Sequence, residues 1–515
     1  MEKIEKCLAL TLAMVAGVCL YAVTPYGLGT SPDSIGYLKS AEGLIDGEGL
    51  KYFNPQWPPI YPLLIASFSW IFDVSVIDGA RLLSSLILGA VIYVISNYGC
   101  KGKRLIWIIL AIQICIHPLV THIYFYAWSE TLFFLIILIN FKYLEKLIKI
   151  NTNDEKDYIF LNLVLVICVI LASMTRYAGV TLLMTNVVVI LIFNKNILIL
   201  KRIKLIAIHI VIFVTVTSSW FIYTYLNFKT LSNRSIKLHP PEIDQIEKAF
   251  VEIGKWYLPG NFRVYDIYYI IVGVVLIIYI LINILNLRAD KSKTKEKEEY
   301  ISQIFSIFSL IYLCFILVTV TFIDLATPLD NRILSPVFIS LAICIVKVLS
   351  KKTNKYFIKY LLVVYVVMVS ISSLIDLKHW SMLSRYNGIE LTSQEHKSKE
   401  INKFIKECDK STKIISDKPW EFDMYTKAKV DWLPRTYDMT SGAINKNYNH
   451  QIRDLYTIYS IIIIRDLKSE YINDINVTNK YSQIYNNIDG VLFVNKKILD
   501  ENLCNLELKI KKQHE

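Results

Sequence analysis

Apolar stretches of about twenty residues recur through the first 376 residues of this 515-residue chain and then stop. Each is long enough to cross a hydrocarbon core of about 30 Å as a helix. Hydrophobic residues make up 54% of the chain, more than a water-soluble protein carries, and the excess is expected to face lipid. The sequence therefore predicts a mainly α, polytopic membrane protein of about eleven spans, at residues 5–25, 80–98, 105–122, 129–148, 158–174, 178–194, 205–226, 267–287, 301–322, 333–349 and 357–376.

Lysine and arginine gather in alternate loops between these segments, which indicates the orientation because cytoplasmic loops carry the excess of both. The basic loops all fall on one side if the N-terminus is cytoplasmic. The first helix has no clear small-residue cleavage site, so it is interpreted as a retained span rather than a cleaved signal peptide. The same pattern accounts for the net charge of +12, so a nucleic acid partner is not expected. Eleven crossings then place residues 377–515 outside the cell, attached to a multi-pass protein of the cell membrane.

Two folded parts are predicted, a transmembrane domain at residues 1–376 and a soluble extracytoplasmic α/β domain at residues 377–515. In the second part, Glu395–Cys408 has helical spacing and Pro419–Thr426 is consistent with a short helix. Strands are predicted at Thr412–Ser416, Tyr459–Ile464 and Gly490–Val494, with a helix at Leu467–Ile475. Cys408 and Cys504 are the only cysteines of this tail, and in an oxidising compartment they could form a disulfide.

The first external loop, residues 26–79, is longer than a connection requires and is expected to fold. Tyr37–Ile45 has a helical pattern, Asp46–Gly49 is a turn, and the apolar stretch Pro58–Phe72 is too short for a full span and begins with prolines. Two short juxtamembrane helices at the membrane surface would bury its apolar and aromatic faces.

Several short motifs follow one another in a recognisable order. An acid after the first span is followed by a Tyr-Leu…Ala…Leu helix, a Gly-rich turn and an aromatic-Pro-Pro-x-Tyr-Pro-Leu segment. Together they resemble the polyprenyl-phosphate-sugar-dependent glycosyltransferases of the GT-C superfamily, the relatives of protein O-mannosyltransferases and of the lipid A aminoarabinose transferase. The likeness continues through Ala80–Ser84, Ser129–Phe133, Thr175–Gly179, Asn331–Pro336, Ile415–Pro419 and Trp432–Arg435.

The resemblance implies transfer of a sugar from a polyprenyl phosphate carrier to an acceptor hydroxyl, with inversion at the anomeric carbon. Asp33 matches the catalytic base of that superfamily by position. A carboxylate there can remove the proton of the attacking hydroxyl. It is followed by Ser34 rather than by the second acid of many relatives, which puts a paired-carboxylate or metal-bridging role in doubt. The alternative is that Asp33 caps the helix beginning near Ser34.

Arginines at the external ends of spans are candidates for binding the lipid phosphate, because a guanidinium pairs well with phosphate oxygens. Arg332 and Arg176 both stand in short loops poor in other basic residues, and Arg81 follows the same logic. Snorkelling toward headgroups is the alternative for Arg332 and Arg176, and for Arg81 an interface anchor is the favoured interpretation. Glu130 begins a span and could face a water-filled cavity, or could serve as a first-turn acid of its helix.

Aromatic residues of the first external loop complete the candidate substrate site. Trp57 and Tyr61 could stack on a sugar or a polyprenyl chain, and Tyr37 is included with them because it follows Asp33 in the same helix. Aromatic belts at the membrane interface are the alternative explanation. His117 and His122 do not have a spacing that enforces metal binding, so no metal site or cofactor is predicted, and a metal requirement stays open.

The resulting prediction is a membrane glycosyltransferase that uses a polyprenyl-phosphate sugar, with a lipid, glycan or protein as acceptor and the lipid bilayer as its environment. A transporter or flippase of lipid-linked saccharides is the alternative, since it would also use membrane-embedded acids and arginines. Internal repeats with broken helices would favour the transporter, and none is evident in the sequence. A receptor that merely displays the tail would need only one helix as an anchor.

Overall fold

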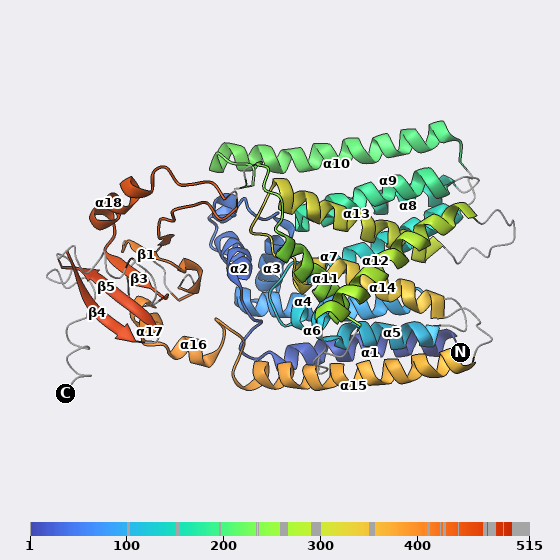
Figure 1. The fold of residues 1–515 in the computed structure, drawn as a ribbon, viewed down its shortest axis with the longest axis horizontal. Helices are drawn as coiled ribbons and strands as arrows, with labels where there is room; N and C mark the ends of the chain where they lie inside the picture. Colours follow the sequence, from blue (N-terminus) through green and yellow to red (C-terminus); the bar gives the residue numbers. More distant parts are fainter. Residues whose placement is uncertain are drawn as a thin grey trace. The chain divides into compact units, whose positions relative to one another are not determined.

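The computed structural model divides the chain into two compact units, whose elements are labelled in Figure 1. Unit 1 comprises Met1–Leu28 and Tyr37–Arg385, and unit 2 comprises Gly29–Gly36 and Tyr386–Glu515. The structure describes residues 2–99, 104–150, 155–194, 197–232, 234, 236–257, 266–289, 300–349, 356–406, 408, 412–422, 424–425, 429–440, 442–466, 471, 480–487 and 489–496.

Unit 1 is built from long apolar helices that run side by side (Figure 1). Among the described residues, seven helices are long and apolar enough to cross a membrane, and a bent pair would make eight. The seven are α1 (Glu2–Val23), α4 (Val76–Ser96), α8 (Glu155–Thr175), α10 (Ile199–Phe228), α12 (Asp266–Ala289), α13 (Tyr300–Phe322) and α15 (Tyr356–Tyr386). The prediction of a mainly α, polytopic membrane protein is confirmed.

The remaining predicted spans are also helical but depart from a simple crossing. Residues 105–122 form two helices, α5 (Arg104–Ile116) and α6 (Pro118–Tyr124), bent by 67°. The break falls at His117 because Pro118 cannot donate a backbone hydrogen bond to the preceding turn and fits the first position of a new helix. The other predicted spans correspond to α7 (Glu130–Lys149), to η2 (Tyr177–Gly179) with α9 (Val180–Phe193), and to α14 (Asn331–Leu349).

Helix α1 lies directly against α4, and glycines permit the close approach. A side chain at Gly17 would come within 2.8 Å of the Ser85 carbonyl oxygen, and one at Gly89 within 2.7 Å of the Ala13 carbonyl oxygen. Neither contact leaves room for a methyl group. Small residues at such crossings allow tight packing of helices in lipid, where burial of apolar surface gives no extra driving force.

The loop at residues 26–79, which the sequence analysis expects outside the cytoplasm, is folded, as predicted. It contains α2 (Pro32–Ile45), η1 (Gly49–Tyr52) and α3 (Ile60–Phe72), and the last of these begins directly after the paired prolines. Helices α2 and α3 lie at one end of the long helices (Figure 1). The long loop after α10 contains a further helix, α11 (Ile243–Lys255), which the sequence analysis did not predict.

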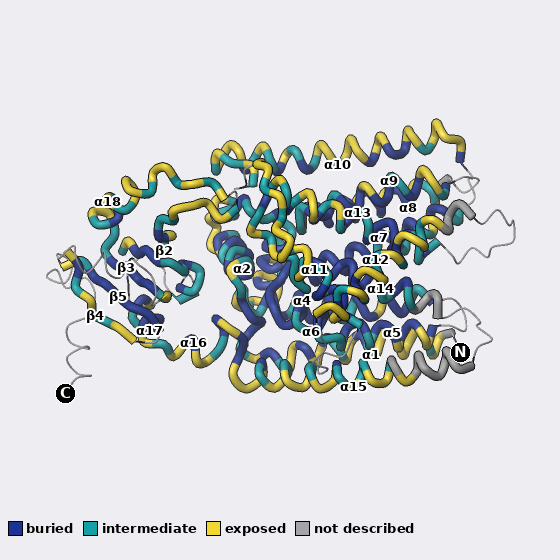
Figure 2. Tube along the Cα trace, in the orientation of Figure 1, coloured by how far each residue is buried: buried dark blue, intermediate teal, exposed yellow. Residues whose placement is uncertain are grey.

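Unit 2 contains the predicted small α/β domain, a five-stranded mixed sheet in the order β2-β1-β3-β5-β4. Strand β1 pairs in parallel with β2 and β3, whereas β5 pairs antiparallel with β3 and β4. The strands are β1 (Ile414–Ser416), β2 (Val430–Trp432), β3 (Ile461–Ile464), β4 (Tyr481–Asn487) and β5 (Gly490–Asn495). Strands β3 and β5 are buried along their length (Figure 2), because apolar clusters cover both faces of the sheet.

Some details of unit 2 differ from the prediction. The helical pattern Glu395–Cys408 forms two short helices, α16 (Gln394–Ser398) and α17 (Glu400–Lys406), with Lys399 in an extended conformation between them. The segment at Pro419 is a single 3₁₀ turn, η3 (Pro419–Glu421), rather than a helix to Thr426. Helix α18 (Tyr448–Ile458) was not predicted. The predicted helix Leu467–Ile475 lies almost entirely outside the described residues, as does Cys504, the proposed disulfide partner of the buried Cys408.

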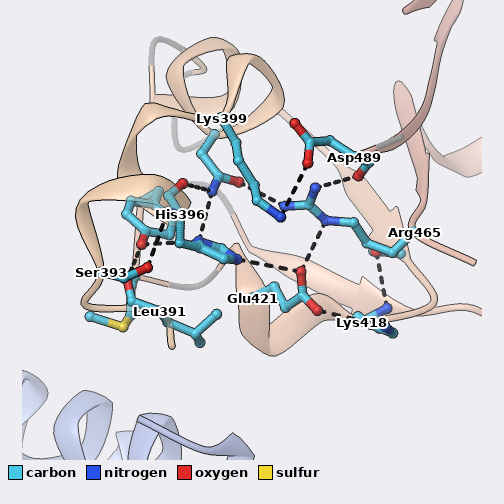
Figure 3. Close-up of polar contacts among 12 residues, drawn as sticks. Leu391, Ser393, His396, Lys399, Lys418, Glu421, Arg465 and Asp489 are labelled. Atoms are coloured by element: carbon cyan, nitrogen blue, oxygen red, sulfur yellow. Dashed lines mark hydrogen bonds and ion pairs between the residues drawn. The ribbon is translucent and has the colours of Figure 1, made fainter. Parts of the chain in front are cut away.

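A buried polar network joins the helical and sheet parts of unit 2 (Figure 3). The Arg465 guanidinium lies 3.0 Å from Glu421 Oε2 and donates to Asn402 Oδ1 at 3.1 Å. The Asn402 amide in turn contacts His396 Nδ1 at 2.9 Å, and His396 Nε2 lies 3.6 Å from the same Glu421 oxygen. Burial raises the pKa of the Glu421 carboxyl, but the hydrogen bond from His396 and the charges of Arg465 and Lys418 outweigh it and hold that pKa below its usual value.

Candidate functional site

Three charged residues from distant parts of unit 1 meet at the ends of helices. Glu130 is the first residue of α7, Arg176 directly follows α8, and Arg332 is the second residue of α14. Glu130 Oε1 lies 2.5 Å from Arg332 Nε and 2.5 Å from Arg176 Nη1. The carboxylate is 1% exposed, and the two arginine side chains are 15–16% exposed. One carboxylate thus stands between two guanidinium groups, and the cluster carries a net positive charge.

The residues that precede Glu130 hold the two arginines in place. Arg176 Nη1 donates to Ser129 Oγ at 3.2 Å, and the Tyr37 hydroxyl contacts the same oxygen at 3.1 Å. The Arg332 guanidinium lies over the Trp128 ring, 4.3 Å from its centroid. Such cation–π and hydrogen-bond contacts fix the orientation of the guanidinium planes, so the two arginines are preorganised before a ligand binds.

An aromatic group from the loop at residues 26–79 adjoins this cluster. The Tyr37 ring packs edge-on against Trp57 at 5.6 Å and against Tyr61 at 5.1 Å between centroids. The Tyr61 hydroxyl is buried and has no hydrogen-bond partner among the described residues. A buried hydroxyl without a partner is costly, so this one is well suited to bond a ligand.

This arrangement can bind an anion. Two arginines in a partly desolvated place present planar donors to phosphate or carboxylate oxygens, and such charge-assisted bonds are stronger than neutral ones. Glu130 neutralises one of the two positive charges, which offsets part of the desolvation free energy of burying two guanidinium groups. The four candidates Glu130, Arg176, Arg332 and Tyr37 are therefore brought together, with Trp57 and Tyr61 beside them.

Asp33 stands in the first turn of α2 and belongs to the part of the chain that groups with unit 2. The helix begins at Pro32, and its backbone is capped by Ser31, whose Oγ accepts from the Ser34 amide at 3.4 Å. Asp33 therefore lies inside the first turn of α2, and the hydroxyl of Ser31 occupies the capping position. Asp33 precedes Tyr37 by four residues, a spacing that places both side chains on one face of α2.

Arg81 makes the contacts of a structural link between α1 and α4. Its guanidinium donates to the Tyr21 carbonyl oxygen and to Thr24 Oγ1, each at 3.1 Å from Nε, and pairs with Asp78 at 3.2 Å. The same group lies over the Tyr21 ring, 3.7 Å from its centroid. These partners occupy Arg81 on several sides.

The two histidines of α6 are engaged by the protein. His117 caps α6 by accepting from the Leu119 amide, and its Nε2 lies 3.0 Å from the Trp256 carbonyl oxygen. His122 packs among aromatic rings, including Trp128 at 5.4 Å. Within the described residues no group of three or more His, Cys, Asp or Glu side chains is arranged to hold a metal ion.

Sequence reasoning missed a polar contact next to Arg332. The side chain of Asn331, the first residue of α14, is bonded on both sides by residues of α11 and its C-terminal end. The signal available in the sequence was the segment Glu242–Gln245, because an acid followed three residues later by glutamine can form a capping box and open a helix. The structure contains that capping box at the start of α11.

Comparisons with known proteins identify the fold. No family model matches the chain, and no curated protein matches its sequence. Among solved structures, ArnT from Cupriavidus metallidurans bound to undecaprenyl phosphate matches with a TM-score of 0.63 and 10% identity over 97% of this chain and 98% of that one. The chain therefore shares the fold of that structure over nearly its whole length.

Structures of an oligosaccharyltransferase share the same fold. The Archaeoglobus fulgidus oligosaccharyltransferase in complex with Zn and sulfate matches with a TM-score of 0.53 and 10% identity, over 95% of this chain and 73% of that one. The archaeal oligosaccharyltransferase AglB with an inhibitory peptide and a dolichol-phosphate matches with a TM-score of 0.50 and 10% identity, over 96% and 75%. The predicted GT-C resemblance is confirmed at the level of the fold.

Proposed function

We propose that the protein is an inverting glycosyltransferase that moves a sugar from a polyprenyl phosphate carrier to an acceptor hydroxyl at the external membrane face. The observation that carries the proposal is the cluster of Glu130, Arg176 and Arg332 on a GT-C fold. An arginine pair at the ends of membrane helices suits a ligand whose phosphate lies at the membrane surface and whose tail lies in lipid. The solved structures with undecaprenyl phosphate and dolichol-phosphate are consistent with such a ligand.

In the proposed reaction, Arg332 and Arg176 bind the donor phosphate. The acceptor oxygen attacks the anomeric carbon, and the bond from that carbon to the phosphate oxygen breaks with its electron pair passing to the phosphate. The guanidinium groups stabilise this growing negative charge. Asp33 takes the proton of the acceptor hydroxyl as general base.

Tyr37, Trp57 and Tyr61 are proposed to contact the sugar or the first part of the carrier. The Tyr61 hydroxyl can donate to an oxygen of the bound donor, which would give it the partner that the described residues do not supply. The ring contacts of Tyr37 with Trp57 and Tyr61 hold the three side chains as one unit. Glu130 is assigned to positioning the arginines rather than to proton transfer, because both of its oxygens contact Arg332.

The test is transfer of radiolabelled sugar from polyprenyl-phosphate sugars to extracted membrane acceptors, with Asp33→Asn compared with wild type. We expect the variant to lose at least about two orders of magnitude in rate, as removal of a general base predicts. Asp46→Asn is the matched control, since Asp46 is an exposed acid of the same loop. Full activity of Asp33→Asn would contradict the role of Asp33, and absence of transfer by wild type from any donor would favour the transporter alternative.

A further inference from the structure

Asn331 connects the external helix α11 to the helix that carries Arg332. Its Oδ1 accepts from Trp256 Nε1 at 2.7 Å, and its Nδ2 donates to Glu252 Oε2 at 2.6 Å. The side-chain amide of asparagine offers a donor and an acceptor in one plane, so it satisfies an indole N–H and a carboxylate at the same time. We refer to Asn331, Glu252 and Trp256 as the Asn331 clasp.

Helix α11 is itself firmly placed within unit 1. A side chain at Gly254 would come within 2.0 Å of the Tyr269 carbonyl oxygen, and one at Gly273 within 2.7 Å of the Phe250 carbonyl oxygen, so the backbones of α11 and α12 touch. The Trp256 carbonyl oxygen also contacts His117 at 3.0 Å. Hydrogen bonds from Asn331 to α11 therefore attach the start of α14 to a helix that is held in place by α12 and His117.

The start of α14 is held from several directions. The Ile333 amide donates to Asp330 Oδ1 at 3.0 Å, and the Tyr312 hydroxyl donates to the Ile333 carbonyl oxygen at 2.9 Å. Between these contacts stand Asn331, bonded to α11, and Arg332, bonded to Glu130. Because they are adjacent in the chain, a shift of the Asn331 backbone moves the Arg332 guanidinium as well.

We propose that Asn331 is a positioning residue, which sets the Arg332 guanidinium for the phosphate of the donor through its bonds to α11. This inference rests on the proposed function and deepens it, because it assigns to the loop after α10 a part in phosphate binding. A misplacement of about 1 Å at a charged contact can cost up to about a hundredfold in rate. Through the Asn331 clasp, the position of α11 therefore affects how strongly Arg332 binds the donor phosphate.

The experiment uses the polarity of the clasp. In Asn331→Asp, the introduced carboxylate still accepts from Trp256 but faces the Glu252 carboxylate, so the contact becomes repulsive. Adding Glu252→Gln supplies an amide that donates to the carboxylate introduced at position 331, and the bond is restored with donor and acceptor exchanged. Asp244→Asn is the matched control, because Asp244 is an exposed acid of the same helix. The probe is undecaprenyl phosphate, and its binding to the full-length protein is measured from thermal stabilisation as a function of its concentration.

We expect Asn331→Asp to bind the probe at least about tenfold more weakly than wild type and to lower kcat for sugar transfer, with both recovered in the double variant. Amide hydrogen exchange of residues 331–336, at the start of α14, should rise in Asn331→Asp and fall again in the double variant. A variant that loses stability but binds the probe and turns over as wild type does would overturn the proposal, since its role would be structural.

The two levels of inference fail differently. If wild type is not stabilised by undecaprenyl phosphate, the proposed function fails and the positioning role fails with it. If wild type responds and Asn331→Asp responds equally, the proposed function stands and the inference about Asn331 is wrong. Exchange that stays unchanged at the start of α14 in Asn331→Asp would also contradict it, because that segment would then not depend on the clasp.

Discussion

Glu130 is the residue on which the charge balance of the candidate site depends. It is almost completely buried and lies 2.5 Å from a nitrogen of each of two arginines. Removing one partner of a buried ion pair costs far more than the pair contributes, because the other charge is left without compensation. In this cluster the loss of one carboxylate would leave two guanidinium groups close together.

Glu130→Gln is therefore predicted to lower the free energy of unfolding by about 3 kcal/mol, toward the low end for buried pairs because the arginines are partly exposed. Undecaprenyl phosphate should stabilise this variant more than wild type, since the phosphate replaces the missing negative charge. Thermal unfolding with and without the lipid measures both effects.

Glu145→Gln serves as the control for that measurement. Glu145 is on the same helix and pairs with Lys149 at 2.6 Å, one turn along α7. Pairs of this spacing contribute only about 0.3–0.5 kcal/mol, so little change is expected. Equal stability of the two variants would show that Glu130 does not neutralise the arginines.

The meeting of these residues could not be predicted from the sequence. Glu130 and Arg332 are 202 positions apart, and no basic residue stands near Glu130 in the chain. The loop charges indicated that Glu130, Arg176 and Arg332 belong to one membrane face, because Glu130 and Arg332 begin helices on that side and Arg176 follows the end of a helix there. Which of them touch depends on how the helices pack, and apolar lipid-facing segments carry little information about their neighbours.

At the scale of elements, the sequence predicts the interior of each unit better than its edges. Ile461–Ile464 is apolar at every position, as expected of a strand buried on both faces, and β3 was predicted correctly. Strands β2 and β4 contain polar residues with mixed burial, and neither was predicted. Their strand conformation comes from pairing with β1 and β5 rather than from their own pattern.

The polar network of unit 2 allows an element-scale prediction, because Glu421 of η3 bonds groups on α16 and just after β3. Its pKa is lowered in the folded state, so its stabilising contribution is complete above its unfolded pKa and is lost as the pH falls through the folded value. We expect Glu421→Gln to unfold at a lower temperature than wild type at pH 7, and the difference to shrink at acidic pH below about 4.5.

Thermal unfolding of the full-length protein between about pH 3 and pH 7 measures this difference. Glu395→Gln is a suitable comparison, since Glu395 is exposed on α16. If the difference in unfolding temperature between wild type and Glu421→Gln stays constant over the whole pH range, the charge of the carboxylate does not contribute to stability.

At the scale of the whole molecule, this chain and ArnT share a fold although their sequences have little in common. The ArnT structure matches 97% of this chain at 10% identity, while no family model matches. Lipid-facing positions need only be apolar, so many substitutions are equivalent there, and the constraint falls on helix lengths, small residues at crossings and charges at helix ends. A shared order of helices at 10% identity is expected for that reason.

The number of crossings decides on which side the two ends of the chain lie. Among the described residues, the long apolar helices and the bent pair α5–α6 give eight possible crossings. If α7, η2 with α9, and α14 also cross, the total is eleven, and the ends lie on opposite sides. If one of them does not, the number is even and both ends lie on the same side.

We predict eleven crossings, with the N-terminus in the cytoplasm, because the basic loops then all fall on the cytoplasmic side. Full-length protein with alkaline phosphatase at its C-terminus, produced in a bacterial host, should be active, since this enzyme matures only outside the cytoplasm. The same position fused to green fluorescent protein should stay dark. Fusions within residues 290–299, a basic loop expected in the cytoplasm, should behave in the opposite way and control for expression. A fluorescent C-terminal fusion would mean an even number of crossings and would place unit 2 on the cytoplasmic side, away from any acceptor outside the cell.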